Sequence, residues 1–262
     1  MPSDSSAEAR MQGPAAPAHA PRASVWQRLA GPFKEFGPGA GTLYVVDRLL
    51  RSISPRLGLY AYELMVQPIA PTPLLPPNLT RNLRFLEIDC GHADLALMPA
   101  RDEIKAARFE QGARCLGVYR KDKLIGYLWF SFRRYHEDEV RCTYELAVAE
   151  RSVFDFDVYV MPENRMGIGF AAVWHGANAF LAQRGVGYTF SRVTRFNLAS
   201  RRAHAHLGGR CVGRAMFFKA GIFELMFASI RPYLSVSWSR NHRVRLRLAP
   251  DVLQTAGKPA PH

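Results

Sequence analysis

The chain has 262 residues, 48% of them hydrophobic, which is enough apolar material for one large domain or two small ones. The formal net charge is +13, and residues 201–262 hold eleven Lys and Arg against two Asp and Glu, so the excess is mostly C-terminal. No segment has the roughly 18 consecutive apolar residues that a membrane-spanning helix needs. The four cysteines lack metal-site spacing and the N-terminal residues lack the apolar core of a secretion signal, so we expect a cytoplasmic protein without a metal site.

The first 80 residues fall into two parts. Residues 1–40 are rich in Ala, Pro, Ser and Gly without periodicity, which is typical of a disordered lead-in. Residues 41–80 form an N-terminal extension. In it, apolar residues at helical spacing predict a helix over 42–54, an apolar run predicts a strand over 57–66, and a Pro-rich linker follows.

Residues 81–249 alternate regularly between strands and helices and are expected to form one domain, followed by a disordered tail at 250–262. The expected strands lie at 83–88, 115–119, 124–132, 141–148, 154–161, 188–193 and 210–219. The expected helices lie at 100–111, 167–183 and 198–207, whereas the segment 222–230 could be either type. This order predicts an α/β fold with a mixed, mainly antiparallel central sheet flanked by helices.

The basic C-terminal segment allows two interpretations. Arg243, Arg245 and Arg247 alternate with apolar residues, as in an edge strand whose charges discourage pairing with other chains. The same charges would attract a polyanion or the surface of an anionic membrane. Nucleic acid is not an expected partner, whereas peripheral membrane contact stays open.

A glycine turn after the expected strand at 154–161 carries the clearest chemical signal. The turn contains two glycines one residue apart and leads directly into a long apolar helix. Its residues are Asn164, Arg165, Met166, Gly167, Ile168 and Gly169. Backbone N–H groups at a helix N-terminus, together with the helix dipole, form a site for a phosphate group.

A second segment follows about 30 residues later, after one helix and one strand. It contains Asn197, Ser200 and His204 and ends at Gly208 and Gly209. Together, the glycine turn and this segment resemble the two motifs of the GNAT superfamily, the acyl-CoA-dependent N-acetyltransferases, over about residues 83–220. The family's pattern has Arg or Gln where this chain has Asn164, Tyr where it has His204, and Phe where it has Gly209.

The resemblance implies a binding site for acetyl-CoA or another acyl-CoA as co-substrate. The glycine turn would hold the pyrophosphate, and the backbone of Tyr159, Val160 and Met161 would pair with the pantetheine arm. The N–H of Val160 would polarise the thioester carbonyl, while Asn197 and Ser200 would steady the pantetheine.

The acid and base of the implied reaction are less directly indicated. His204 could protonate the departing thiolate, because an imidazole titrates near neutral pH, or it could be a plain surface histidine. Asp157 and Glu145 are the candidate bases for the amine, with Asp155 on the same face as Asp157. A water chain could also serve.

The sequence therefore predicts an N-acyltransferase that moves acetyl from acetyl-CoA to an amine in a ternary complex. One alternative is a related enzyme that transfers an aminoacyl or longer acyl group to a cell-envelope precursor. Another is a module that binds CoA or a polyanion without catalysis. The acceptor could be a small-molecule or an envelope-precursor amine, and residues 41–80 could form part of its pocket or a homodimer surface.

Overall fold

The structure is a computed structural model and describes residues 25–254. The first helix, α1 (Val25–Ile53), is kinked at Gly37, whose φ of 77° and ψ of 170° are not helical. The helix expected at 42–54 is the second half of this longer element, which also contains residues 25–40 of the expected lead-in. The rest of the lead-in and residues 255–262 of the expected tail lie outside the described residues. Within residues 25–254, no helix is both long and apolar enough to cross a membrane.

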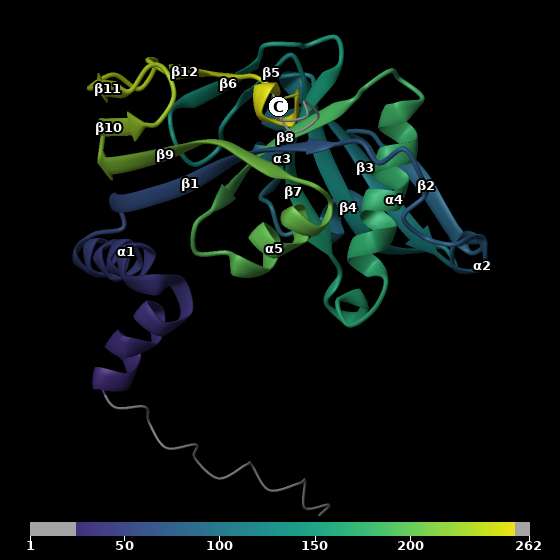
Figure 1. Cartoon of the computed structure of the whole chain (residues 1–262), viewed down its shortest axis with the longest axis horizontal. Coiled ribbons are helices and arrows are strands. Elements are labelled where there is room, and N and C mark those ends of the chain that lie inside the picture. The colour runs from purple at the N-terminus through teal and green to yellow at the C-terminus, as the bar shows by residue number, and fades with distance from the viewer. Residues whose placement is uncertain (1–24, 255–262) are drawn as a thin grey trace, which may run out of the picture.

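Nine strands form the main sheet, in the order β11-β10-β9-β1-β8-β7-β4-β3-β2 (Figure 1). They are β1 (Leu57–Pro68), β2 (Leu83–Ile88), β3 (Arg114–Arg120), β4 (Lys123–Phe132), β7 (Ser152–Val160), β8 (Tyr188–Thr194), β9 (Arg210–Ala220), β10 (Phe223–Ala228) and β11 (Leu234–Ser237). β7 and β8 are parallel, and the other neighbours in this sheet are antiparallel. The predicted α/β class with a mixed, mainly antiparallel sheet is confirmed, and the ambiguous segment at 222–230 contains a strand.

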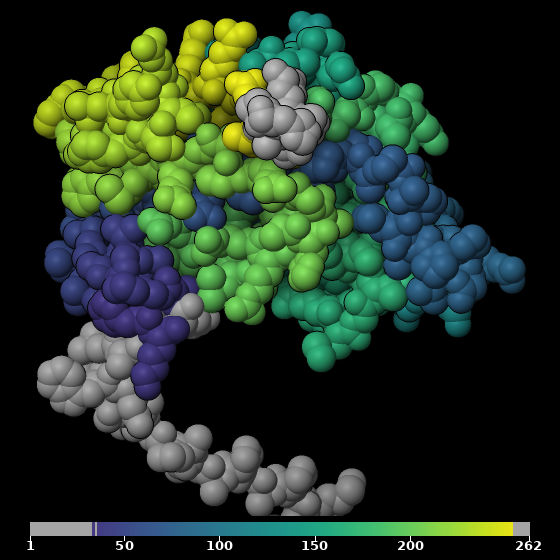
Figure 2. All heavy atoms as spheres, viewed as in Figure 1, coloured from purple at the N-terminus to yellow at the C-terminus, as the bar shows by residue number. Residues whose placement is uncertain are grey.

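The strand of the N-terminal extension lies in the middle of this sheet. β1 pairs antiparallel with β8 on one side and with β9 on the other. Most of its residues are buried, because helices or other strands cover both of its faces. Figure 2 shows the consequence on the surface, where the yellow-green strands β9–β11 lie directly beside the purple and blue N-terminal segments. The predicted boundary near residue 80, between the N-terminal extension and the following domain, therefore does not separate two sheets, because strands from both sides of it belong to the same sheet.

Helices cover both faces of the main sheet. α4 (Gly169–Ala182) packs on β3, β4 and β7, and α5 (Leu198–His206) lies on the same face, over β1. α3 (Asp102–Glu110) packs on the opposite face, where the rings of Phe109 and Trp129 lie 4.8 Å apart. The short elements are α2 (Pro77–Thr80), η1 (Ala93–Leu97), η2 (Pro162–Asn164) and α6 (Asp251–Gln254).

A second sheet of three strands packs against the face opposite α4. It consists of β5 (Arg134–His136), β6 (Cys142–Leu146) and β12 (Val244–Leu248), with β12 at one edge. The rings of Tyr144 and Phe154 stack across the two sheets at 4.7 Å. Along β12 the apolar residues are buried, whereas Arg245 and Arg247 are exposed. The alternating arginines thus belong to an edge strand, and the residues expected at 141–148 belong to this second sheet.

Candidate active site

The main sheet splits between β7 and β8. The two strands pair only at their first residues, Ser152 to Phe154 with Tyr188 to Phe190. Beyond that point β7 continues to pair with β4, and β8 continues to pair with β1. The facing edges of β7 and β8 therefore diverge, and their backbone groups are free to pair with an extended ligand. The resemblance to the GNAT superfamily placed the pantetheine arm along this open part of β7.

A bulge in β7 marks the open part of the gap. The register between β4 and β7 shifts between Tyr127 and Trp129, and Asp157 has a φ of 51°. A positive φ is uncommon outside glycine, and a bulge re-aims the side chain of the residue that carries it. The Asp157 carboxylate accepts a hydrogen bond of 2.6 Å from the guanidinium of Arg108 on α3.

The end of β7 presents one backbone unit toward the gap. The N–H of Met161 donates to the carbonyl of Ile125 at 2.9 Å, on the β4 side. Because backbone groups alternate along a strand, the N–H and C=O of Val160 face the other side, toward the gap. Nε of Arg165 donates to this Val160 carbonyl at 3.1 Å, and its guanidinium lies over the ring of Tyr159 at 5.2 Å.

The glycine turn directly precedes α4. Within the described chain, the N–H groups of Met166, Gly167 and Ile168 have no backbone acceptor, although each could donate one hydrogen bond. Met166 is 99% exposed and its neighbours Arg165 and Gly167 are exposed as well, so this part of the turn is open to solvent.

The two glycines of the turn play different roles. A Cβ at Gly169 would lie 2.6 Å from the Asn164 carbonyl oxygen and 2.6 Å from Cγ1 of Val160. A Cβ at Gly167 would meet no atom within 4 Å. Gly169 is therefore required for the close packing of the turn itself, whereas Gly167 leaves an open approach to the backbone.

The second motif caps α5 at both ends. The Asn197 side chain accepts a hydrogen bond of 2.9 Å from the N–H of Ser200, as a helix N-cap does. At the other end, Gly208 has a φ of 80° and the N–H of Gly209 donates to the carbonyl of His204 at 2.8 Å, which is a Schellman motif. Asn197 and Gly208 thus both have structural functions as caps of α5.

A pocket of about 500 Å³ lies between α4 and α5, beside the glycine turn. Its walls are mostly apolar, with Phe170 and Ala171 from the start of α4 and Ala203 from α5. Arg202 and His206 supply polar groups to its lining. It is therefore suited to a ligand with an apolar or aromatic part next to an anionic one.

His204 is buried, with 4% of its surface exposed. Its Nδ1 lies 3.0 Å from Oε1 of Gln67 on β1, and its ring meets the ring of Trp174 edge to face. Burial lowers the pKa of His204 to about 4, so the imidazole is neutral at neutral pH. These contacts favour a packing role over the proton-donor role that the motif position suggested.

The carboxylates predicted as bases lie in three different environments. Asp157 is at the bulge beside the gap, as described above. Glu145 is on β6 of the second sheet, with Arg245 at 3.5 Å, so its strand does not border the gap. Asp155 is buried on the α4 face, where desolvation raises its pKa to about 7. The expectation that Asp155 and Asp157 share one face is wrong, because the bulge at Asp157 turns its side chain toward Arg108 on the α3 face. Of the three carboxylates, only Asp157 is both partly exposed and at the open end of β7.

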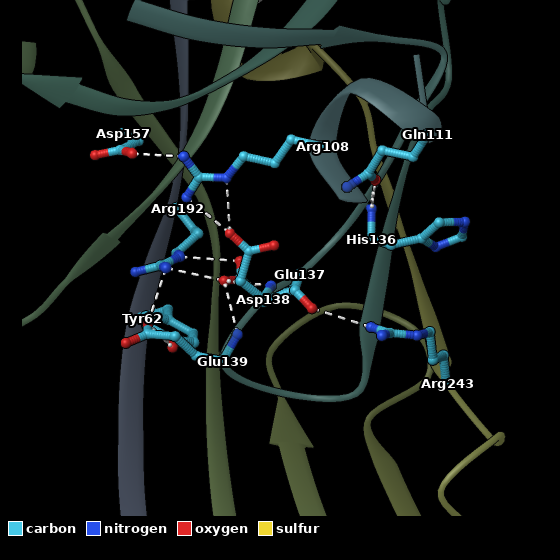
Figure 3. A network of polar contacts seen from close by, with 10 residues as sticks. All are labelled: Tyr62, Arg108, Gln111, His136, Glu137, Asp138, Glu139, Asp157, Arg192 and Arg243. Atoms are coloured by element: carbon cyan, nitrogen blue, oxygen red, sulfur yellow. Dashed lines mark hydrogen bonds and ion pairs between the residues drawn. The ribbon is translucent and has the colours of Figure 1, made fainter. Parts of the chain in front are cut away.

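A network of charged side chains borders the gap on the α3 side, and Figure 3 shows it at close range. Its centre is the loop 137–139 between β5 and β6. Asp138 pairs with Arg108 at 2.8 Å, and Glu137 and Glu139 pair with Arg192 of β8 at 2.9 and 2.8 Å. The hydroxyl of Tyr62 donates to Glu139 at 2.9 Å. The network thus connects β7, through Arg108 and Asp157, with β8 and β1.

The sequence showed only part of this network. The run of three acidic residues at 137–139 is visible in the sequence. Nothing in the spacing of Arg108 and Arg192 indicated that they meet this turn, because the two arginines are 84 positions apart on different elements. Among the described residues, no cluster of His, Cys, Asp and Glu could hold a metal ion.

The fold and the site together define a mixed α/β domain with a split sheet and a glycine turn whose N–H groups lack backbone acceptors in the described chain. Residues 83–209 match the family model described as the acetyltransferase (GNAT) family, and the chain carries a GNAT domain over these residues. The predicted resemblance is confirmed. A comparison with curated proteins found no match.

A search of solved structures returned several GNAT proteins at low identity. A GNAT-family protein from Novosphingobium aromaticivorans is 16% identical, with a TM-score of 0.39 over 62% of this chain and 64% of that one. A tandem GNAT protein from the clavulanic acid biosynthesis pathway is 14% identical, with a TM-score of 0.43 over 62% of this chain and 53% of that one. An aminoglycoside N-acetyltransferase in complex with CoA is 16% identical, with a TM-score of 0.35 over 48% of this chain and 86% of that one. The chain thus spans less than two thirds of the length of the first two structures.

Proposed function

We propose that the chain is an acyl-CoA-dependent N-acyltransferase that transfers acetyl from acetyl-CoA to an amine by direct attack in a ternary complex. The observation that carries the proposal is the row of N–H groups without a backbone acceptor at Met166, Gly167 and Ile168. These groups lie at the N-terminal end of α4, a helix of 14 residues whose dipole favours a negative charge there. The pyrophosphate of acyl-CoA carries that charge.

The split sheet supports a place for the rest of the donor. The pantetheine arm, an extended chain with two amide groups, would lie against the free edge of β7 at Tyr159, Val160 and Met161. The N–H of Val160 would then donate to the thioester carbonyl and stabilise the negative charge that develops on its oxygen. Arg165, which contacts the Val160 carbonyl and is adjacent to Asn164, would turn toward the phosphates.

The pocket between α4 and α5 would take the nucleotide end of the donor. Its apolar wall suits a purine ring, and Arg202 suits a phosphate through charge-assisted hydrogen bonds. Asn197 retains its amide NH₂ group for the pantetheine, because only its oxygen is used in the cap. Ser200, in the first turn of α5, would contact the same arm.

The transfer requires two proton movements. As the amine nitrogen forms its bond to the acyl carbon, the carbon–sulfur bond breaks, the amine loses a proton and the thiolate takes one up. Asp157 is our first candidate base, because it lies at the bulge beside the gap, where Arg108 contacts its carboxylate at 2.6 Å. Glu145, acting through water, is the second. The buried His204 would reach the thiolate only through its Nε2, so a water molecule is an equally suitable acid.

A second candidate function is a module that binds acyl-CoA without catalysis. The neutral, buried state of His204 favours it, because the motif position that often carries an acid has none here. Transfer to an envelope precursor remains an alternative for the enzyme, with the basic C-terminal residues as its support. The free cysteines agree with the proposed cytoplasmic location, a reducing compartment.

Acetyl-CoA turnover across a panel of amines, followed with a thiol-detecting reagent, tests the proposal. Amine-dependent release of free CoA supports the enzyme. Saturable CoA binding without amine-dependent release supports the module. Absence of CoA binding contradicts both functions.

A further inference from the structure

A cationic pocket lies at the opposite side of the sheet from the glycine turn. It has a volume of about 590 Å³ and is lined by Arg56, Arg141, Lys219, Gly221, Ile222 and Arg240. Its lining residues come from the part of the sheet where β9 turns into β10 and β1 begins, which is at the left of Figure 1, whereas α4 is at the right. None of the six lining residues is acidic, and the nearby buried carboxylate of Glu224 is used by the N–H of Arg141 at 2.9 Å, so the lining itself is cationic.

The four cations come from four separate segments of the chain. Arg56 precedes β1, Arg141 precedes β6, Lys219 is near the end of β9, and Arg240 lies between β11 and β12. The backbone holds this arrangement together, because the N–H of Gly221 donates to the carbonyl of Arg56 at 3.1 Å. Convergence of this kind is a property of the fold and not of one basic stretch of sequence.

Two of the cations are fixed by carbonyl groups and not by carboxylates. Arg141 donates through Nη2 to the carbonyl of Ile222 at 2.8 Å, and its Nε is buried without a partner in the described chain. Lys219 donates to the carbonyl of Glu139. A carbonyl orients a cation but does not neutralise its charge, so both remain available to an anion.

Three other buried or partly buried arginines differ in this respect. Arg108, Arg192 and Arg201 each pair with a carboxylate at 2.8 Å. In the described residues, no carboxylate lies within ion-pair distance of any of the four cations in the pocket. Because concentrated positive charge is costly without a counter-charge, a pocket of this kind is suited to an external oxyanion.

The pocket is in contact with the network that borders the gap. Glu139, whose carbonyl accepts from Lys219, pairs through its carboxylate with Arg192 and Tyr62. Lys219 of the pocket thus contacts the acidic loop 137–139 directly. The acidic loop therefore contacts both Arg192 on β8, which borders the gap, and Lys219 in the pocket.

We propose that this cationic pocket binds an oxyanion group, a phosphate or a carboxylate, of the acceptor molecule. The acceptor is then an amine that carries an acidic group, with its amine held toward the acidic loop and the gap. This inference rests on the proposed function for the identity of the acceptor, but oxyanion binding can be measured without any reaction.

The test uses a variant that removes charge without removing a described contact. Arg56→Gln with Arg240→Gln neutralises two exposed cations of the pocket and leaves Arg141 and Lys219 in place. Arg210→Gln with Arg247→Gln is the matched control, because it removes the same charge from two exposed residues outside the pocket. Inorganic phosphate, pyrophosphate and citrate are titrated into each protein at low ionic strength by calorimetry, with CoA in a separate titration.

At least one of these oxyanions is expected to bind the wild type and the control with similar affinity, and to bind the pocket variant at least tenfold more weakly. CoA affinity should be the same in all three proteins. Equal oxyanion affinity in the pocket variant and the control would overturn the inference, as would the absence of binding by all three oxyanions. Loss of CoA binding in the wild type would instead contradict the proposed function.

A second measurement addresses the acceptor. With acetyl-CoA as donor, phosphoethanolamine should be a better substrate than ethanolamine, and the pocket variant should raise KM for phosphoethanolamine without changing KM for acetyl-CoA. The carboxylate source is compared in the same way with β-alanine. Uncharged amines that are preferred over both acidic ones would contradict the inference.

Discussion

Gly167 offers the sharpest single test of the glycine turn. A Cβ at this position meets no atom within 4 Å, and the residue does not have a positive φ. The substitution Gly167→Ala should therefore change the free energy of unfolding by no more than about 0.5 kcal/mol, as for other surface sites. Any loss of CoA affinity then reflects the approach of the ligand and not damage to the fold.

The expected loss follows from the hydrogen bonds at stake. A hydrogen bond to a charged group contributes about 1.5–3 kcal/mol, so pushing the pyrophosphate away from one N–H group should weaken binding by roughly 10- to 100-fold. The bulkier Gly167→Val should weaken it further. Calorimetric titration with CoA measures the affinity, and thermal unfolding measures the stability of the same samples.

Gly169→Ala is the matched comparison. Its Cβ would lie 2.6 Å from the Asn164 oxygen, so the turn must shift, and we expect a cost of about 1–3 kcal/mol in stability together with weaker CoA binding. If Gly167→Ala and Gly167→Val bind CoA as the wild type does, the assignment of this turn to the pyrophosphate is refuted.

Three further predictions concern groups around the gap. Because burial raises the pKa of Asp155 to about 7, the folded form keeps a proton that the unfolded chain loses, so stability should fall by on the order of 4 kcal/mol as pH rises from about 4 to 7. Asp155→Asn should remove this pH dependence of the free energy of unfolding in urea, and an unchanged dependence would contradict the assignment. His204 has a lowered pKa of about 4, so the stability that it contributes should be lost as pH falls from about 6.5 to 4. His204→Gln should retain turnover, and a large loss of kcat in this variant would indicate that His204 is the catalytic acid after all. Arg108→Ala should lower the free energy of unfolding by about 3–5 kcal/mol, because it leaves the Asp138 and Asp157 carboxylates uncompensated. The control Arg84→Ala breaks an exposed pair with Asp122 and should cost less than about 1 kcal/mol in the same chemical unfolding measurement. Similar costs for the two variants would argue against a structural role for the network.

The local elements were predictable because each has a clear sequence pattern. The hairpin of β3 and β4 has two apolar strands around a charged turn, and Lys121 and Asp122 adopt the positive φ values of 49° and 61° that such a tight turn requires. The glycines after α4 and α5 marked both helix ends. The glycine turn was visible because its chemistry depends on consecutive residues.

The arrangement of the elements was less accessible. β1 gives no sign in its sequence that it lies between β8 and β9, since pairing partners are chosen across more than 120 residues. The packing role of His204 could not be read from its own segment, because its ring contacts Gln67, which is 137 positions away in the sequence. The network around Arg108 and the cationic pocket have the same origin, because both are assembled from segments that only the fold brings together.

The central claim is that the donor lies across the glycine turn and the gap between β7 and β8. A crystal structure of the full chain with CoA tests it most directly. We predict pyrophosphate density against the N–H groups of Met166, Gly167 and Ile168, and pantetheine density along Tyr159, Val160 and Met161. Density for CoA at any other place on the protein, with this turn and gap occupied only by solvent, would contradict the account.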